Sequence, residues 1–456
     1  MRLYNTLTRT VETVEPREAG RFGLYVCGPT VQEAPHFGHA RAALVPDVLR
    51  RYLAWRGLEV FFVRNVTDVE DKIIAKAQET GQHPAVVAET YTRAYDSAMA
   101  RLGIAPPDIA PRATGHILEM IELIETLLER GSAYVVDGDV YFAVRSYAAY
   151  GQLSNRDIDE LRAGGRIEPD ERKRDPLDFA LWKAAKPGEP SWRSPWGYGR
   201  PGWHIECSAM SLKYLGAGFD LHAGGLDLVF PHHENEIAQA EAAGYPFARM
   251  WLHNGLLSID GEKMSKSLGN VVSLTEALDR YGADVLRFFY LAAHYRSPLD
   301  FNPERLDEAR AAVDRWRAFL RAAGAVTDAP SDDGDVKAAR DAFAAALDDD
   351  LNTPRAHAAL FVLASAGFGQ LERGERAAAA AARDAFAELA GVLGYDLSES
   401  GSGSDLVGPL VEELLALRDA ARARKDFATA DAIRSRLTAL GITVEDTPDG
   451  ARWHLG

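Results

Sequence analysis

The sequence predicts an α/β protein in which a doubly wound parallel sheet is split by an insertion and followed by a helical bundle and a small C-terminal domain. A β-rich run, a Gly-Pro turn, a helical run and a second β-rich run follow one another over residues 20–63, the opening pattern of a doubly wound domain. A Gly-, Pro- and Trp-rich stretch around 175–201 interrupts the pattern, which resumes at Trp203. An Ala-rich region over about 303–392 predicts the bundle, because Ala has the highest helix propensity.

The composition is that of a globular protein with several domains. At 456 residues the chain is too long for one ordinary core. No apolar run approaches the roughly 20 residues that cross a bilayer, and residues 1–5 do not open an apolar signal segment. Two cysteines do not make a disulfide framework, which favours a reducing compartment. We therefore expect a cytoplasmic protein without membrane contact.

The net charge of −16 argues mildly against a nucleic-acid partner, because phosphate contacts need Lys and Arg. The total does not decide the matter, since the field over one face can oppose it. Residues 418–436 hold five Arg and one Lys against three Asp. This segment is either a basic binding face or a solvated helix surface.

The opening α/β unit places polar side chains where ligands bind such sheets. Residues 20–27 read as a short buried strand, 41–57 have the apolar periodicity of a helix, and 58–63 are β-rich. Ligands of doubly wound sheets lie beyond the carboxyl ends of the strands. We expect Cys27 and the segment 65–68 to lie there.

Changes in composition divide the rest of the chain. A Ser- and Gly-rich stretch at 398–404 has the composition of a flexible linker. We expect a split α/β domain over 1–115 and 200–245, a connective insertion over 116–199, a loop-bearing region over 246–302, a helical bundle over 303–395 and a C-terminal domain over 405–456.

The run His36-Phe37-Gly38-His39 lies between the strand-ending turn and the first helix. A helix N-terminus offers unpaired N–H groups and a positive dipole end, which suit phosphate. Both imidazoles can donate to the oxygens of a nucleotide triphosphate, and Gly38 would let an adenine ring approach the backbone. A structural turn is the alternative for these four residues taken alone.

A second run, Lys263-Met264-Ser265-Lys266-Ser267, reads as a glycine-flanked loop. Lys263 and Lys266, with hydroxyls between and beside them, can neutralise charge that builds up on a departing pyrophosphate. By itself this run is equally explained by a solvated basic loop.

Both cysteines lie in segments suited to metal chemistry. Cys27 follows the first strand, Cys207 ends the run Trp-His-Ile-Glu-Cys, and His232 and Glu236 share one face if they lie on a helix. Two thiols, an imidazole and a carboxylate make a zinc site, which points to a substrate that itself carries sulfur. His233 and Glu234 are expected to point elsewhere, with a surface position favoured for each, and Cys207 taken alone is more often a small buried apolar residue.

The two Lys- and His-bearing motifs, in this order and spacing, resemble the paired ATP-binding elements of class I aminoacyl-tRNA synthetases. The four metal-site residues resemble, position for position, the zinc set of the cysteinyl-tRNA synthetases. The resemblance extends along almost the whole chain, through residues 3–9, 175–183, 199–210, 348–354, 425–428 and 446–448. Two positions depart from the pattern: Gln32 stands where the family usually has Tyr, and Phe37 where Ile is common.

This resemblance implies a class I Rossmann-type catalytic domain that activates L-cysteine with ATP and Mg²⁺ and transfers it to tRNA-Cys. It implies one Zn²⁺ per subunit, a monomer, and segments 348–354 and 425–448 in the tRNA-reading half. The region 246–302 would contact the tRNA stem, and the C-terminal domain 405–456 would bind the anticodon. His36, His39 and Lys266 would stabilise the phosphate charge, with Lys263 assisting. The remaining ligand-binding residues that we expect are Gly28, Thr30, Gly38, Thr67, Trp203 and Asp227. Direct recognition of the thiol would discriminate without an editing domain.

Two alternatives remain at this point. A cysteine ligase of mycothiol synthesis would share the catalytic fold and the zinc set but acylate an amino sugar. It resembles the chain less beyond residue 300, and the segments 348–354 and 418–436 favour tRNA as the acceptor. A tRNA- or metal-binding paralogue without catalysis is the other, and the intact run 263–267 argues against it.

Overall fold

The computed structural model describes residues 1–158, 172–259, 262–263, 272–324, 326, 334–397, 402–447 and 450–455. The chain forms two compact units, Met1–Asp396 and Leu397–Gly456. Among the described residues, no helix combines the length and the apolar character needed to cross a membrane.

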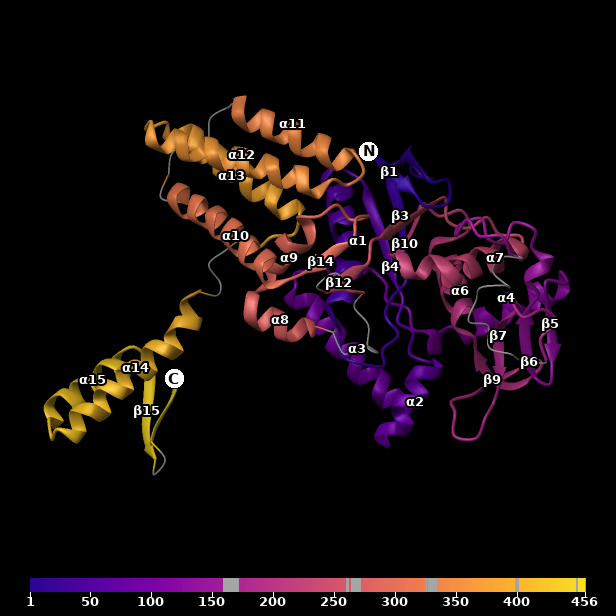
Figure 1. Ribbon diagram of the computed structural model, residues 1–456, viewed down its shortest axis with the longest axis horizontal. Helices are drawn as coiled ribbons and strands as arrows, with labels where there is room; N and C mark the ends of the chain where they lie inside the picture. Colours follow the sequence, from indigo (N-terminus) through magenta and orange to yellow (C-terminus); the bar gives the residue numbers. More distant parts are fainter. Residues whose placement is uncertain are drawn as a thin grey trace. The chain divides into compact units, whose positions relative to one another are not determined.

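The first unit is built around a sheet of four parallel strands in the order β11-β10-β3-β4. The strands are β3 (Arg21–Val26), β4 (Glu59–Arg64), β10 (Leu221–Gly225) and β11 (Met250–Asn254). Helix α1 (Phe37–Trp55) joins β3 to β4, as expected, and packs on the sheet (Figure 1). Connections leave β3 toward one side and β10 toward the other, so their carboxyl ends form the switch-point crevice in which such sheets bind ligands.

One domain boundary differs from the expectation. Strand β11 lies within 246–302, which the sequence separated from the α/β domain, yet it pairs with β10 along its whole length. All five of its residues are buried. Buried parallel strands are usually recognised by a continuous apolar run, and β11 lacks one because His and Asn follow Trp and Leu. The sheet therefore extends past residue 245.

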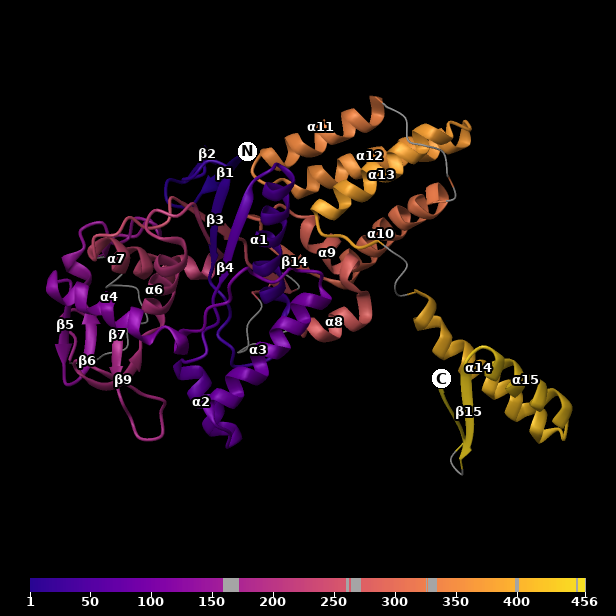
Figure 2. The same ribbon diagram turned by 180° about the vertical axis from the view of Figure 1, so that it is seen from behind.

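The predicted insertion contains a five-stranded antiparallel sheet in the order β5-β6-β7-β9-β8. Its strands lie beside α4 and α6 in the view from behind (Figure 2). Gly199 is required here, because a Cβ at this position would lie 2.2 Å from Nε1 of the buried Trp182. The elements are α4 (Ile117–Glu129), β5 (Ala133–Val136), β6 (Asp139–Phe142), β7 (Phe179–Ala184), β8 (Trp192–Ser194), β9 (Gly197–Pro201) and α6 (Trp203–Leu215).

Smaller elements surround the parallel sheet. They are β1 (Arg2–Asn5), β2 (Thr10–Thr13), α2 (Asp71–Thr80), α3 (Pro84–Arg101), η1 (Ala113–Gly115), η2 (Val144–Ser146), η3 (Leu226–Leu228), η4 (Val229–His233), α7 (Glu234–Ala242), β12 (Leu257–Ile259), β13 (Glu262–Lys263), α8 (Leu274–Tyr281), α9 (Ala283–Leu291) and β14 (Leu299–Phe301). Strand β12 pairs with β13 on one side and with β14 on the other.

The Ala-rich region forms the expected helices. They are α10 (Pro303–Gly324), α11 (Gly334–Asp348), α12 (Thr353–Glu372) and α13 (Arg376–Val392). Trp316, Phe319 and Phe386 are fully buried between them. The predicted interruption near 327–335 lies largely outside the described residues, and α11 begins at Gly334.

The acidic run at the end of α11 joins the bundle to β1 and α1 of the same unit. The carboxylate of Asp350 accepts from the Tyr4 backbone N–H at 2.8 Å and from the Tyr295 hydroxyl at 2.7 Å. The hydroxyl of Tyr52 on α1 donates to Asp348 at 2.8 Å. This run, which the resemblance placed in the tRNA-reading half, thus has a structural role that the sequence did not predict.

The second unit is a small α/β domain with its own core. Its elements are α14 (Ser402–Ala423), α15 (Phe427–Ala439), β15 (Ile442–Thr447) and β16 (Gly450–Leu455). Helix α14 begins inside the predicted linker 398–404, so the linker is shorter than expected. The basic residues Arg422, Arg424 and Lys425 are exposed near the turn between the helices, whereas Arg418 is buried.

The bundle contains a histidine that links its stability to pH. His357 is 4 % exposed, its ring stacks on Phe288, and its Nε2 lies 2.8 Å from the Tyr395 hydroxyl. Burial lowers the pKa of His357 to about 3. The folded state therefore keeps the ring neutral, while the unfolded chain binds a proton below pH 6.5, so stability is complete above that pH and is lost as the pH falls toward 3.

We expect His357→Gln, which keeps a partner for Tyr395 but does not titrate, to weaken the acid destabilisation. The difference amounts to about 2 kcal/mol at pH 5, because one proton is involved over 1.5 pH units. Thermal unfolding at pH 7.5 and pH 5 measures it. The exposed His83 provides a control through His83→Gln. An unchanged pH dependence in His357→Gln would show that His357 does not cause the loss.

Candidate metal and nucleotide site

A cleft of 420 Å³ lies at the switch point of the parallel sheet. It is lined from the carboxyl end of β3, the start of α1, the end of β10 and the first residue of α6. The cleft therefore runs from Cys27 to His36 and His39, as the strand order predicts.

The four predicted metal ligands converge beside this cleft. Their donor atoms all lie within 4.8 Å of one another. The Sγ of Cys27 lies 3.5 Å from the Sγ of Cys207 and 3.4 Å from Oε1 of Glu236. The Nε2 of His232 lies 3.0 Å from the same oxygen. Two sulfurs, an imidazole nitrogen and a carboxylate oxygen at these separations fit a tetrahedral zinc site.

Packing against the insertion holds the segment that carries His232 and Glu236. Glu234 is fully buried, and its carboxylate accepts from the backbone N–H groups of Gly151 at 2.9 Å and Ser154 at 2.8 Å. The hydroxyl of Tyr150 donates to Asn235 at 2.5 Å. The expectation of a surface position for Glu234 is wrong, because its carboxylate fixes the turn before α7 to the neighbouring subdomain.

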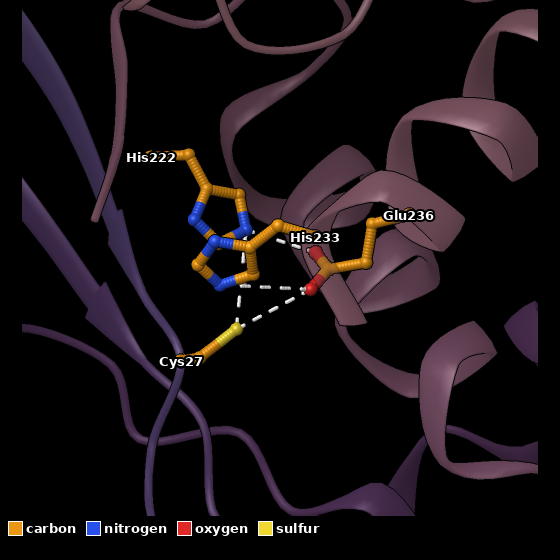
Figure 3. A group of neighbouring side chains, drawn as sticks. All are labelled: Cys27, His222, His233 and Glu236. Carbon is orange, nitrogen blue, oxygen red and sulfur yellow. Dashed lines mark hydrogen bonds and ion pairs between the residues drawn. The ribbon is translucent and has the colours of Figure 1, made fainter. Parts of the chain in front are cut away.

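Two further histidines reach the same cluster (Figure 3). His222 comes from β10, and its Nε2 lies 2.8 Å from Oε2 of Glu236. His233 is fully buried, with Nε2 4.0 Å from Oε1 of Glu236, so the expectation that it points away is also wrong. Cys27, His222, His233 and Glu236 thus form an alternative ligand set. His222 is the second residue of β10, and no local pattern in the sequence marked it as a candidate ligand.

Burial disfavours the charged forms of the side chains in this cluster. Burial raises the pKa of the Cys27 thiol well above its ordinary value, and the neighbouring Cys207 adds to the effect. The pKa of the Cys207 thiol is also raised by burial. Burial lowers the pKa of His232, as do the neighbouring imidazoles. Thiolates in this place require a nearby positive charge, which a divalent metal ion supplies.

The His-x-Gly-His run begins α1. His36 is the N-cap residue, and its Nδ1 accepts from the Gly38 backbone N–H at 3.1 Å. The Nδ1 of His39 accepts from the His36 backbone N–H at 3.1 Å, and the two rings stack with centroids 3.8 Å apart. Because each Nδ1 is an acceptor, each neutral ring carries its proton on Nε2. The caps explain why the helix starts at Phe37 instead of Arg41.

The two departures from the family pattern have different positions. Phe37 is fully buried against Phe289 and Phe301, and its carbonyl accepts from the Tyr290 hydroxyl at 2.9 Å. It therefore supports the first helical turn from behind. Gln32, in contrast, lines the cleft.

The other predicted ligand-binding residues divide into two groups. Gly28, Thr30, Gly38, Trp203 and Asp227 line the cleft. A Cβ at Gly28 would lie 1.6 Å from the Asn65 carbonyl oxygen, so only glycine fits there. Thr67 is not among the lining residues; it is 1 % exposed, and its hydroxyl accepts from Asn65 at 3.2 Å.

Trp203 and Asp227 flank the metal-site end of the cleft. The Trp203 ring stacks on His232, with centroids 4.1 Å apart. Asp227 is exposed in η3, directly after β10. Its Oδ1 would lie 2.4 Å from a Cβ at Gly225, so glycine at that position gives the carboxylate its room.

Of the run 263–267, which is expected to bind ATP, the structure describes only Lys263. Lys263 is the last residue of β13 and pairs with Ser258 of β12. Lys266 lies outside the described residues.

Comparisons with known proteins cover the chain from end to end. Residues 13–311 match the family model described as tRNA synthetases class I (C) catalytic domain, 342–398 match the DALR domain, and 406–453 match the cysteinyl-tRNA ligase anticodon binding domain. The chain is 49% identical to a cysteine–tRNA ligase of Desulfitobacterium hafniense, over 100% of this chain and 99% of that protein. It is 50% identical to a cysteine–tRNA ligase of Methylobacillus flagellatus, over 99% of each.

Solved structures support the fold. A methionyl-tRNA synthetase of Mycobacterium tuberculosis in complex with methionyl-adenylate aligns with a TM-score of 0.59 at 18% identity, over 82% of this chain and 89% of that one. A leucyl-tRNA synthetase (LeuRS) of Agrobacterium radiobacter in a ternary complex aligns with a TM-score of 0.62 at 13% identity, over 84% and 85%. The catalytic fold is thus that of class I aminoacyl-tRNA synthetases, as the sequence predicted.

Proposed function

Since the chain belongs to the cysteine–tRNA ligase family of class I aminoacyl-tRNA synthetases, we propose that Cys27, Cys207, His232 and Glu236 hold a zinc ion that recognises the sulfur of its substrate. The enzyme uses ATP to attach L-cysteine to tRNA-Cys and releases AMP and diphosphate. The observation that carries the proposal is the convergence of the four donor atoms beside a cleft that also contains the His-x-Gly-His run.

Zinc in this site would supply a soft Lewis acid, which prefers a thiolate to the harder and less acidic hydroxyl of serine. The protein's own contribution is to keep the donors close together and out of water. His222 holds the second oxygen of Glu236, a type of contact that orients a ligand carboxylate. Trp203 covers His232 and forms a wall on which the substrate side chain can pack.

His36 and His39 act at the phosphate end of the same cleft. Activation requires the cysteine carboxylate to attack the α-phosphate of ATP, which is brought in with Mg²⁺. The Nε2–H donors of the two stacked imidazoles meet the negative charge that develops on the phosphate oxygens. Lys263 and Lys266 act on the departing pyrophosphate. Gly28, Thr30 and Gly38 shape the floor and walls that bring the reacting groups together.

The cysteinyl group then passes to the terminal ribose of tRNA-Cys. The exposed Arg422, Arg424 and Lys425 of the second unit offer positive charge for the tRNA backbone. Of the two alternatives considered above, an amino-sugar acceptor has no use for this basic surface or for a domain of the anticodon-binding type. We further propose a monomeric cytoplasmic enzyme, in keeping with the resemblance and with the free, unpaired thiols.

Asp227 offers a test of how the substrate is held. Its exposed carboxylate lines the cleft near the metal ligands, where it is suited to the ammonium group of cysteine or to a nucleotide hydroxyl. We expect Asp227→Asn to reduce kcat/KM for cysteine or for ATP by about 10- to 100-fold, the cost of one lost charged hydrogen bond. Cysteine-dependent ATP–pyrophosphate exchange measures both constants.

The exposed Glu241 of α7, away from the lining residues of the cleft, provides the control through Glu241→Gln. Unchanged constants for both substrates in Asp227→Asn would remove Asp227 from the site. Cysteine-independent exchange in the wild type would contradict the activation reaction itself.

A further inference from the structure

Arg41 lies on the same helix as the first ATP-binding motif, two residues after His39. Its side chain is 1 % exposed and reaches the wall of the cleft. The guanidinium donates to the backbone carbonyl of Leu256 at 2.9 Å, of Tyr295 at 3.2 Å and of Ser297 at 2.5 Å. It thus connects α1 to two chain segments that are distant in sequence.

These two segments also bond to each other. The Gly255 N–H donates to the Tyr295 carbonyl at 2.8 Å, and the Leu299 N–H donates to the Leu256 carbonyl at 3.1 Å. Arg41 therefore binds the same two carbonyls that already receive these backbone donors. A Cβ at Gly255 would lie 2.5 Å from the Ser297 oxygen, so the segments are in close contact. Arg41 closes this junction from the side of α1.

The junction is the start of the hairpin that bears the second ATP-binding motif. Leu257, directly after it, begins β12 and pairs with Leu299 of β14. Strand β12 then pairs with β13, whose last residue is Lys263. A single side chain thus fixes the helix that carries the His-x-Gly-His run to the base of the strands that carry Lys263.

Among the described residues, the buried guanidinium of Arg41 is bound by backbone carbonyls and not by a carboxylate, which is an unusual arrangement for a buried charge. In the part of the chain that the structure describes, the hydrogen-bond partners of Arg41 are backbone carbonyls, including that of His294 at 3.4 Å, and its Nε has no partner. Burial lowers the pKa of Arg41 to about 10, which still leaves it charged at neutral pH. A planar guanidinium reaches several acceptors at fixed angles, and an ammonium group cannot do so. The arrangement of these carbonyls therefore favours arginine over lysine at position 41.

We propose that Arg41 is a positioning residue for the activation step, which sets the distance between the two ATP-binding motifs by fixing α1 to the junction of β12 and β14. This inference rests on the proposed roles of His36, His39 and Lys263. Both motifs must contact one triphosphate, and small displacements of such groups cost about 10²-fold in rate. Arg41 is not required for holding cysteine or zinc, because its hydrogen-bond partners include none of the four proposed metal ligands.

The test compares the two half-reactions in Arg41→Gln. We expect the rate constant of cysteine-dependent ATP–pyrophosphate exchange to fall by about 10²-fold. The KM for cysteine and the zinc content per chain should stay at wild-type values. Transfer of preformed cysteinyl-adenylate to tRNA-Cys, which does not use the second motif on a triphosphate, should change by less than about 3-fold. Arg41→Lys keeps the positive charge but lacks the planar guanidinium. Its exchange rate should also fall, by less than in Arg41→Gln, while transfer to tRNA-Cys stays unchanged.

Arg17, although exposed, provides a control for the loss of a guanidinium that bonds to two backbone carbonyls, those of Leu215 at 3.0 Å and Ala217 at 2.8 Å. It lies outside the residues that line the cleft. Arg17→Gln should lower the unfolding temperature and should not slow pyrophosphate exchange relative to transfer to tRNA-Cys.

Exchange at the wild-type rate in Arg41→Gln would overturn the proposal, as would an equal loss of rate in both half-reactions. If Arg41→Gln does not fold, Arg41→Lys decides by the same criteria. Absence of exchange in the wild type would instead refute the proposed function.

Discussion

Replacing Cys207 with alanine is expected to remove bound zinc and cysteine activation together. Cys207 is buried, and its sulfur lies 3.5 Å from that of Cys27, so the loss of this thiol leaves three donors of the proposed set. The alternative set with His222 and His233 does not contain Cys207, so metal held by that set would survive the substitution. We expect zinc to fall from about one ion per chain to near zero, and kcat/KM for cysteine to fall by on the order of 10³-fold, since a site built around one polar contact depends on it.

Metal analysis of the purified protein and cysteine-dependent ATP–pyrophosphate exchange measure the two losses. Ser211→Ala is the matched control, because Ser211 is also buried on helix α6 and, among the described residues, its hydroxyl donates to the Ser208 carbonyl of the same helix. It should retain zinc and activity. Normal charging of tRNA by Cys207→Ala, or by wild-type enzyme stripped of metal, would contradict the zinc-dependent recognition of cysteine.

The second large effect is expected from His36→Asn. Asparagine is a strong N-cap residue, so this substitution preserves the start of α1 while it removes the imidazole Nε2–H donor. We expect the rate of adenylate formation to fall by about 10²- to 10³-fold, the range for loss of one donor to a developing oxyanion. Zinc content and thermal stability should remain close to wild type, because the metal ligands do not contact His36.

His83 offers a control for the cap itself. It is the N-cap residue of α3, and its Nδ1 accepts from the Ala85 backbone N–H at 3.2 Å, the same type of contact that His36 makes. His83→Asn should therefore leave both stability and pyrophosphate exchange unchanged. If His36→Asn activates cysteine as fast as the wild type does, the run serves only as a helix start.

Much of the site was predictable because its signals are local. A strand that ends at Cys27, a turn and a capped helix with two histidines require only neighbouring residues, and each appears in the structure. The types of the four metal ligands were also sufficient to predict their convergence. Local chemistry did not predict β11, because Trp, Leu, His and Asn in succession show no strand periodicity.

Burial was the least predictable property. His233 and Glu234 follow His232 directly and read as surface residues, yet both are fully buried because the insertion packs over the turn before α7. The sequence predicts only that Arg41 begins a helical run, and gives no sign of its burial. Its acceptors come from segments more than 200 positions away, and no pattern near Arg41 reports them.

The amino-acid sequence by itself determined the chemistry: which side chains can bind a soft metal ion, which can donate to phosphate, and which strand ends carry them. Tertiary structure alone decided which histidines surround Glu236, which strand completes the sheet, and how α1 is joined to the base of the β12–β13 hairpin. The physical reason is that residue type and local backbone preference are short-range properties. Desolvation and convergence exist only after distant segments have packed together.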